Sequence, residues 1–135
     1  MAGAPVELIR GIPLFSDLDG RELDAVASSM KARTFEAGRT VVEEGTTGVG
    51  FFVIESGTAT VTVDGRPVRT LGSGDHFGEL ALIGNVGRTA SVVADTELRC
   101  FGMSFWDFRP LVESNASIAW KLLEAMARRL SGASA

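Results

Sequence analysis

The sequence is poor in the residues that build disulfides and metal sites. Its 135 residues include one cysteine, Cys100, and one histidine, His76. A single cysteine excludes an internal disulfide and fits a reducing, cytoplasmic setting. Because Cys100 stands among apolar residues such as Leu98 and Phe101, we expect a buried structural thiol rather than a reactive one. A barrel that holds a metal needs several histidines or carboxylates at ligand spacing, so we expect no metal and a His76 that points outward or pairs locally.

Long apolar runs and excess positive charge are also missing. No run approaches the ~20 residues that span a bilayer, and residues 1–15 lack the basic start and apolar stretch of a signal peptide. The net charge is −4, which disfavours binding to nucleic acid or to an anionic membrane. The chain has neither a Gly-x-Ser-x-Gly elbow nor a Cys–His arrangement. These absences favour a binding module over an enzyme.

The residues that are present predict a small β-rich domain. Hydrophobic residues make up 45% of the chain and charged residues 22%, as in soluble globular proteins. The 16 glycines indicate many turns and therefore many short strands. We expect strands near 33–36, 40–42, 51–55, 58–63, 68–71, 89–93 and 97–102, with a hairpin turn at Asp64-Gly65. About eight short strands at this spacing predict an antiparallel roll or barrel, and the length 1–135 fits one domain.

Helices are expected at both ends of the strand region. Residues 5–15 form a short helix or turn, and Asp17 or Asp19 can cap a helix over roughly 20–30. A third helix begins after Ser104, and Pro110 should kink or interrupt it.

The last helix is expected over about 117–130. Its apolar residues recur every four positions, at Ile118, Leu122, Met126 and Leu130, supported by Ala119 and Leu123. Arg128 and Arg129 would then sit favourably at its C-terminal end, and residues 132–135 would form a loose tail.

One stretch, residues 77–94, has a layout that suits a small anion carrying a hydroxyl group. Gly78 has no Cβ, so backbone there can approach a ligand closely. Residues 79–83 can form one or two helical turns whose first N–H groups face an anion. Arg88 can hold a phosphate through two parallel donors. Glu79 would repel that phosphate, and its place is explained if it accepts a hydrogen bond from a sugar hydroxyl.

These residues resemble the phosphate-binding cassette of cyclic nucleotide-binding domains. The matching positions are Phe77-Gly78-Glu79-Leu80-Ala81-Leu82, then Arg88-Thr89-Ala90, then Val92 or Val93 with Ala94. The resemblance implies that Glu79 binds the ribose 2′-hydroxyl and Arg88 the cyclic phosphate. It also implies that Gly78, Leu80 and Ala81 supply backbone contacts, that Thr89 and Ala90 line the nucleotide, and that Val61, Val63 and Leu71 lie toward the base. One departure is Gly87, where the family often has proline.

The resemblance extends from about Leu14 to Leu130. The family's glycines recur at the expected turns, at Gly38, Gly45, Gly57, Gly74 and Gly78. It implies an eight-stranded antiparallel β-roll or jelly roll with N-terminal helices, a short cassette helix and C-terminal helices. In the family the last helix also covers the base. Helical spacing cannot separate that role from plain packing for Leu123, Met126 and Leu130.

The expected function is that of a cyclic nucleotide sensor or regulatory module, with cAMP as the ligand. Cyclic GMP stays open, because in the family a hydroxyl beside the arginine, here Thr89, often helps to accept it. The chain stops at Ala135, which leaves no room for a DNA-recognition helix. It is either a stand-alone sensor or a regulatory domain of a larger channel or enzyme. A barrel that works only through protein contacts is the remaining alternative. The last helix could also bind a protein partner or form a homodimer.

Overall fold

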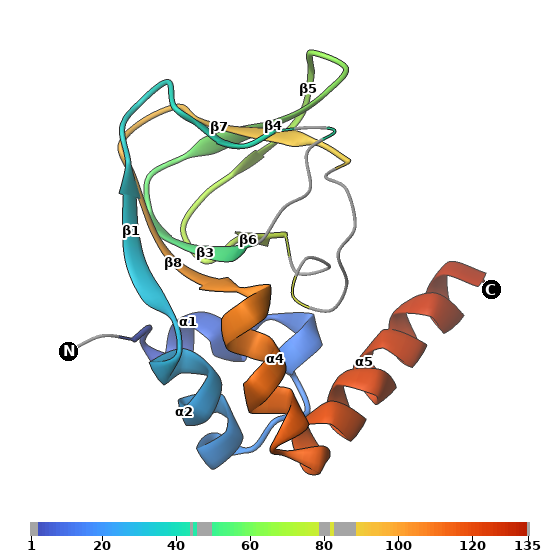
Figure 1. The fold of residues 1–135 in the computed structure, drawn as a ribbon. Coiled ribbons are helices and arrows are strands. Elements are labelled where there is room, and N and C mark those ends of the chain that lie inside the picture. Colours follow the sequence, from blue (N-terminus) through green and yellow to red (C-terminus); the bar gives the residue numbers. More distant parts are fainter. Residues whose placement is uncertain (1–2, 44, 46–49, 79–81, 83–88, 135) are drawn as a thin grey trace.

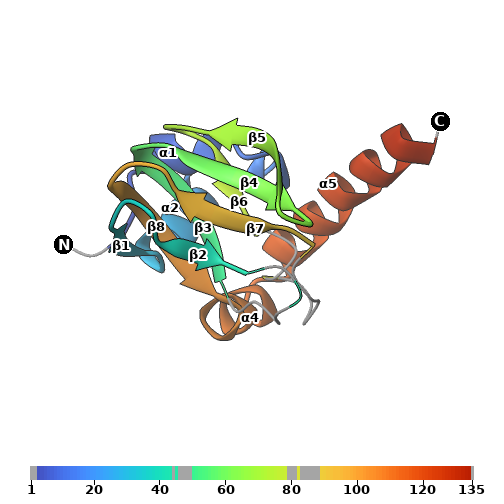
Figure 2. The ribbon, with the colours of Figure 1, turned by 90° about the horizontal axis from the view of Figure 1, so that it is seen from above.

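Two four-stranded antiparallel sheets form a β-roll in the computed structural model, which describes residues 3–43, 45, 50–78, 82 and 89–134 (Figure 1). In spatial order, the strands of the first sheet are β1 (Lys31–Phe35), β8 (Leu98–Ser104), β3 (Gly50–Ser56) and β6 (His76–Phe77). Those of the second sheet are β2 (Thr40–Val42), β7 (Ser91–Ala94), β4 (Ala59–Val63) and β5 (Arg66–Leu71). The roll expected from the strand spacing is confirmed, and Figure 2 shows the second sheet from above.

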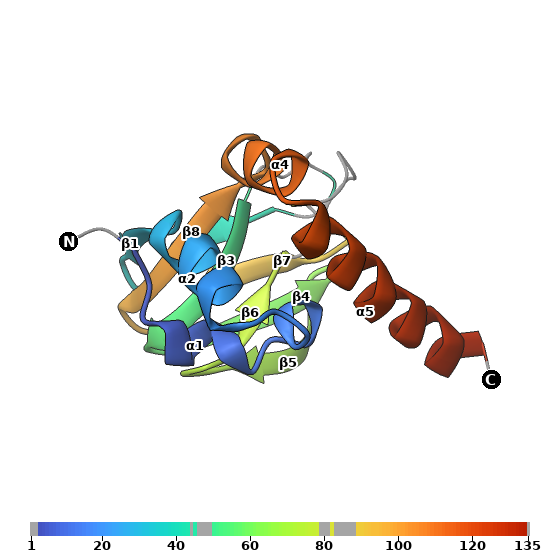
Figure 3. The ribbon, with the colours of Figure 1, turned by 90° about the horizontal axis from the view of Figure 1, so that it is seen from below.

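Helices cover the outer face of the first sheet. They are α1 (Val6–Arg10), the 3₁₀ turn η1 (Pro13–Phe15), α2 (Gly20–Ser28), α4 (Phe105–Glu113) and α5 (Ala116–Ser134). Seen from below, α1, α2 and α4 lie against the sheet, whereas the C-terminal half of α5 extends away from the rest of the molecule (Figure 3). The expected N-terminal and C-terminal helices are therefore present.

Local capping explains where two of these helices begin. Asp19 accepts a hydrogen bond from the backbone N–H of Glu22, and the Glu22 side chain accepts one from the N–H of Asp19, which is a complete capping box. Ser104 accepts a hydrogen bond from the N–H of Asp107 at the start of α4. Both caps agree with the prediction.

Two boundary predictions were wrong. Pro110 does not interrupt α4, which continues to Glu113, and the Ser114 side chain donates to the Pro110 carbonyl just beyond that end. The helix continues because proline lacks only one backbone N–H, the donor that would bond to the carbonyl of Trp106. The other i→i−4 hydrogen bonds of the helix do not use that N–H. Residues 132–134 of the expected tail are also helical, since α5 runs to Ser134 and places Arg128 and Arg129 inside the helix rather than at its end.

Strand β3 is buried on both faces because it divides two hydrophobic cores. Phe51 and Val53 point into the helical core, while Phe52 and Ile54 point into the roll core. The helical core comprises Ile9, Ile12, Leu14, Phe15, Leu18, Leu23, Val26, Ala27, Met30, Phe51, Val53, Leu82, Met103, Phe108, Ile118 and Leu122. The roll core comprises Phe35, Phe52, Ile54, Ala59, Val61, Leu71, Phe77, Val92, Ala94, Leu98 and Cys100. The uninterrupted apolar run 51–54 is the sequence signature of this two-sided burial.

The turns between strands use backbone that only a few residues adopt easily. Asp64 and Gly65 have φ of 53° and 77°, as a type I′ hairpin between β4 and β5 requires. Positive φ is also found at all five glycines expected in turns, Gly38, Gly45, Gly57, Gly74 and Gly78. At Gly57 an added Cβ would lie 2.2 Å from the carbonyl oxygen of Glu97, so close backbone contact excludes a side chain there.

Candidate functional site

A hydrogen-bonded turn between Gly72 and Asp75 precedes the first residues of the candidate site. The N–H of Gly72 donates to the Asp75 carboxylate at 2.8 Å, and the backbones of Ile54 and Asp75 are joined by a 2.8 Å hydrogen bond. Strand β6 then pairs with β3, and the Phe77 ring stacks on Phe52 with centroids 5.3 Å apart. Phe77 is thereby buried in the roll core. Gly78 follows at once with φ of 86°, a conformation that favours glycine.

The candidate site's other end is equally well anchored. Thr89 is exposed, and Ala90 is half-buried against the roll core. Strand β7 then lies between β2 and β4, where Val92 pairs with Val61. Both ends of the stretch 77–94 are therefore fixed to the roll, one on each sheet.

The residues expected to touch the ligand fall into two groups. Glu79, Leu80, Ala81 and Arg88 lie outside the described residues, so their predicted roles remain predictions. Among the others, the structure brings Phe77 and Ala90 together with Val61 and Leu71 in and around the roll core. Val63 is half-buried at the end of β4, beside the hairpin turn. The described part of the site is thus an apolar inner surface of the roll, together with Thr89, an exposed residue that carries a hydroxyl group.

The buried cysteine confirms its expected structural role, while the expectation that His76 points outward or pairs locally stays a prediction. Cys100 is 2% exposed, and burial raises the pKa of its thiol to about 11, which keeps it protonated near neutral pH. His76 is half-buried, with its ring 6.1 Å from that of Phe51. No group of three acidic, histidine or cysteine side chains gathers into a metal site within the described ranges. Nor does any helix in that part of the chain have the length and apolarity that crossing a membrane requires.

An apolar groove of about 530 Å³ lies between α4 and α5. Phe105, Phe108 and Val112 line it from α4, and α5 contributes Ala119, Leu122, Leu123 and Met126. Leu82, which belongs to the stretch 77–94, also lines it and is 1% exposed. The groove therefore adjoins the candidate site through Leu82. Helical spacing left covering of the base and plain packing open for Leu123, Met126 and Leu130. In the structure Met126 is half-buried, whereas Leu123 and Leu130 are exposed, at 60% and 63%.

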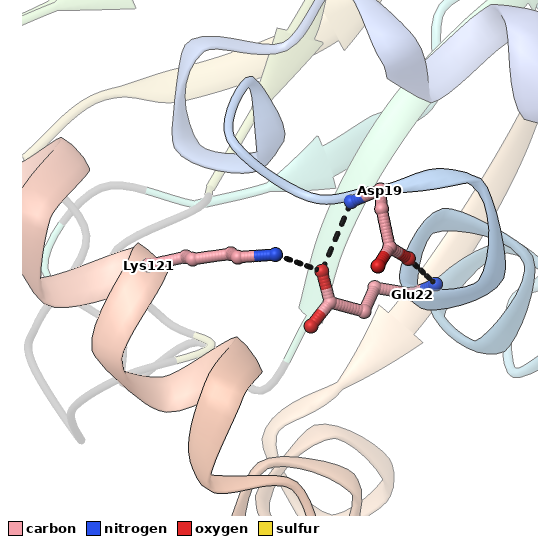
Figure 4. Close-up of polar contacts among 3 residues, drawn as sticks. All are labelled: Asp19, Glu22 and Lys121. Atoms are coloured by element: carbon pink, nitrogen blue, oxygen red, sulfur yellow. Dashed lines mark hydrogen bonds and ion pairs between the residues drawn. The ribbon is translucent and has the colours of Figure 1, made fainter.

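Charged contacts hold α5 to the N-terminal segment. Lys121 donates to the Glu22 carboxylate at 2.6 Å, and Arg128 donates to Asp17 at 2.7 Å (Figure 4 for Lys121). The hydrogen bond from Lys121, followed by that from the Asp19 N–H, lowers the pKa of Glu22 to about 2. We did not predict these pairs. The Asp-x-x-Glu spacing at 19–22 would have revealed the capping box, but no local pattern indicates its link to Lys121.

A family model described as the cyclic nucleotide-binding domain matches residues 32–115, from β1 to just beyond α4. The chain belongs to the cyclic nucleotide-binding domain family. The match contains the whole stretch 77–94 and both sheets of the roll.

This cyclic nucleotide-binding domain is similar to parts of several solved and curated proteins. The N-terminal domain of a transcriptional regulator from Streptomyces coelicolor A3(2) superposes with a TM-score of 0.84 at 30% identity, covering 94% of this chain and 92% of that one. A cAMP-dependent protein kinase regulatory subunit of Yarrowia lipolytica is 39% identical over 93 residues, which are 67% of this chain and 25% of the relative. A cGMP-dependent protein kinase of Toxoplasma gondii is 40% identical over 103 residues, 76% of this chain and 10% of the relative. The chain thus spans a quarter or less of these two curated relatives.

Proposed function

We propose that this chain binds cyclic AMP and acts as the sensor of a regulatory system, with residues 1–135 as one domain. The family match, which includes the whole cassette, carries the proposal. In this assignment Arg88 binds the cyclic phosphate and Glu79 accepts a hydrogen bond from the ribose 2′-hydroxyl. The role is binding and regulation rather than catalysis, and the reduced, buried Cys100 fits a cytoplasmic setting.

The described flanks of the cassette support this assignment. Gly78 has φ of 86°, so the backbone turns sharply where the first ligand contacts are expected. Phe77, Val61 and Leu71 are packed in the roll core, which makes the inner surface apolar. Apolar walls with a few polar groups are typical of small-molecule sites, and an apolar wall suits a purine ring.

Cyclic GMP is the second candidate ligand. Thr89 is exposed at the border of the cassette, where its hydroxyl can reach a bound nucleotide. The similar protein from Toxoplasma gondii is a cGMP-dependent kinase, whereas that from Yarrowia lipolytica is a cAMP-dependent regulatory subunit. Measuring the affinity of this chain for both cAMP and cGMP therefore decides which ligand it prefers. A role through protein contacts alone is the third possibility, and it predicts binding of neither nucleotide.

Isothermal titration calorimetry with cAMP, cGMP and 2′-deoxy-cAMP tests the proposal. Wild type should bind cAMP, and Arg88→Ala should lose ~2–5 kcal/mol, because the phosphate charge is left with backbone donors alone. Arg88→Lys should recover only part of that loss, since an ammonium cannot make the planar two-point contact. Glu79→Ala should hardly distinguish cAMP from the 2′-deoxy ligand, which wild type should bind poorly.

Two controls give these outcomes their meaning. Arg129→Ala removes an exposed arginine far from the cassette in sequence and should leave affinity unchanged. Absence of heat with both cAMP and cGMP at millimolar concentration would contradict ligand binding itself. If Glu79→Ala still rejects the 2′-deoxy ligand as strongly as wild type does, Glu79 does not hold the ribose.

A further inference from the structure

The C-terminal half of α5 carries a serine that stands shortly after a pair of arginines. The sequence there reads Arg128-Arg129-Leu130-Ser131, and each of these side chains is exposed. Figure 3 shows that this part of the helix extends away from the rest of the molecule. Among all serines and threonines of the chain, Ser131 alone has basic residues at both the second and the third position before it. Its hydroxyl is therefore accessible and lies next to two positive charges.

The hydroxyl of Ser131 is also chemically available. Three other serines near helix ends, Ser28, Ser29 and Ser114, each donate to a backbone carbonyl four residues earlier in the chain. Ser131 makes no hydrogen bond of this kind within the described part of the chain. Its oxygen can therefore react without first giving up a hydrogen bond.

The end of α5 can unwind at little cost. Every side chain from Ala127 to Gly132 is exposed, so unwinding loses no buried contact. The ion pair of Arg128 with Asp17 joins side chains that are 57% and 34% exposed, and surface pairs of this kind contribute little stability. Gly132 lies inside the helix, where glycine is the least favourable residue after proline. Local opening is easiest where burial is smallest, so residues 128–134 should readily become extended.

We propose that Ser131 is a phosphorylation site for a kinase whose substrate groove carries carboxylates. Arg128 and Arg129 provide the recognition, because guanidinium groups form strong, paired hydrogen bonds with carboxylates. Kinases distinguish their substrates through charge patterns of this kind. The site lies outside the stretch 77–94, and its assignment does not depend on which nucleotide the chain binds.

The reaction transfers the terminal phosphoryl group of a nucleoside triphosphate. The Oγ of Ser131 attacks the γ-phosphorus and forms a new O–P bond, while the bond from that phosphorus to the oxygen bridging the β-phosphate breaks. The electron pair of the broken bond leaves with the nucleoside diphosphate. The hydroxyl proton passes to a carboxylate base of the kinase.

The added phosphate should keep the end of α5 unwound. A phosphoserine carries a charge of about −1.5 to −2 at pH 7, and negative charge near the C-terminal end of a helix is unfavourable. The phosphorylated chain should therefore show a weaker helix signal in circular dichroism than the unmodified chain. An unchanged signal would contradict this effect.

The first experiment incubates the full chain with ATP, Mg²⁺ and a probe kinase that has an acidic substrate groove, the catalytic subunit of cAMP-dependent protein kinase. Tandem mass spectrometry should locate phosphate on Ser131, and Ser131→Ala should remove it. Arg128→Gln and Arg129→Gln should each lower kcat/KM about tenfold or more, because a charge-assisted contact with the kinase is lost. Arg109→Gln is the matched control, since it removes an exposed arginine from α4, and it should leave kcat/KM unchanged.

Three outcomes would overturn the proposal. One is an unmodified Ser131 in a mixture that phosphorylates a reference peptide. Another is phosphate on a different residue of the chain instead. The third is the same kcat/KM for wild type, Arg128→Gln and Arg129→Gln, which would show that the arginines do not direct the kinase.

The second experiment tests whether the helix end has to open. Asp17→Asn releases Arg128 from its ion pair and should raise kcat/KM by up to about fivefold. Gly132→Ala stabilises the helix and should lower kcat/KM about fivefold. Glu113→Gln is the control, because it removes a surface pair on α4, and it should have no effect. If neither Asp17→Asn nor Gly132→Ala changes kcat/KM, the kinase reads Ser131 on the intact helix and the unwinding step is wrong.

Discussion

Single glycines show how strongly the turns of the roll constrain individual positions. Gly57 and Gly38 have similar positive φ, 97° and 88°, but their surroundings differ. An added Cβ at Gly57 would lie 2.2 Å from the Glu97 carbonyl oxygen, whereas at Gly38 it would meet nothing within 4 Å. The two positions therefore separate the cost of backbone conformation from the cost of steric overlap.

Substitution by alanine should expose this difference. Gly38→Ala should lower the free energy of unfolding by ~1–2 kcal/mol, the cost of left-handed backbone for a residue with a Cβ. Gly57→Ala should cost ~1–3 kcal/mol more, because overlap with the backbone adds to that conformational cost. Urea unfolding of both variants measures the two losses. Equal losses would show that the turn at Gly57 relaxes away from Glu97.

Sequence patterns captured the residues whose environment is local. The Asp19 and Ser104 caps, the Asp64-Gly65 hairpin and the buried Cys100 follow from spacing and neighbours alone, and the structure confirms them. The pairing of Lys121 with Glu22 joins residues 99 positions apart, so no local pattern could reveal it. Glu79 and Arg88 were assigned by resemblance, and their roles stay predictions.

At the scale of elements, α2 and α5 share one carboxylate. Glu22 closes the capping box of α2 and also binds Lys121 of α5, so its charge stabilises the start of one helix and the position of another. Its pKa is lowered from 4.5 to about 2, mainly by the hydrogen bond from Lys121. A carboxyl group with a lowered pKa stabilises the fold above its unfolded-state pKa, and this contribution is lost as the pH falls through the folded-state pKa.

Low pH should therefore remove the extra stability that wild type has over the Glu22→Gln variant. The difference in melting temperature should be full above about pH 4.5 and shrink as the pH falls toward about 2. Thermal unfolding followed by circular dichroism across this window measures it. Glu113→Gln is the control, since it removes an exposed i,i+4 pair with Arg109, and surface pairs contribute little. A Glu22→Gln difference that stays constant down to pH 2 would contradict the predicted linkage.

Element boundaries were harder to predict than element types. Helix α4 continues through Pro110 because only the proline N–H is missing. Helix α5 extends past Leu130, since a glycine such as Gly132 lowers helix stability but does not have to end a helix. The short strand β6 was not predicted separately, since two residues carry no periodicity. Its existence depends on pairing with β3, which is a long-range contact.

At the scale of the whole molecule, a ligand that binds only the folded state stabilises it by mass action. With cAMP at a hundredfold excess over its dissociation constant, the gain is ~2.7 kcal/mol. For a chain of this size the melting temperature should rise by roughly 5 to 10 °C. Differential scanning fluorimetry with and without cAMP measures the shift. Arg88→Ala at the same cAMP concentration should show about a third of that shift or less, and an equal shift in that variant would mean that the nucleotide binds elsewhere.

Because strand β3 takes part in both hydrophobic cores, we expect the helices and the roll to unfold as a single cooperative unit. Because Phe51 and Val53 belong to the helical core while Phe52 and Ile54 belong to the roll core, one strand forms a wall of both. Loss of order on either side removes half of the burial that holds this strand in place. Its central amides should therefore exchange with solvent only when the entire chain unfolds. On heating, the two cores should therefore unfold in one transition, although each is built from its own set of side chains.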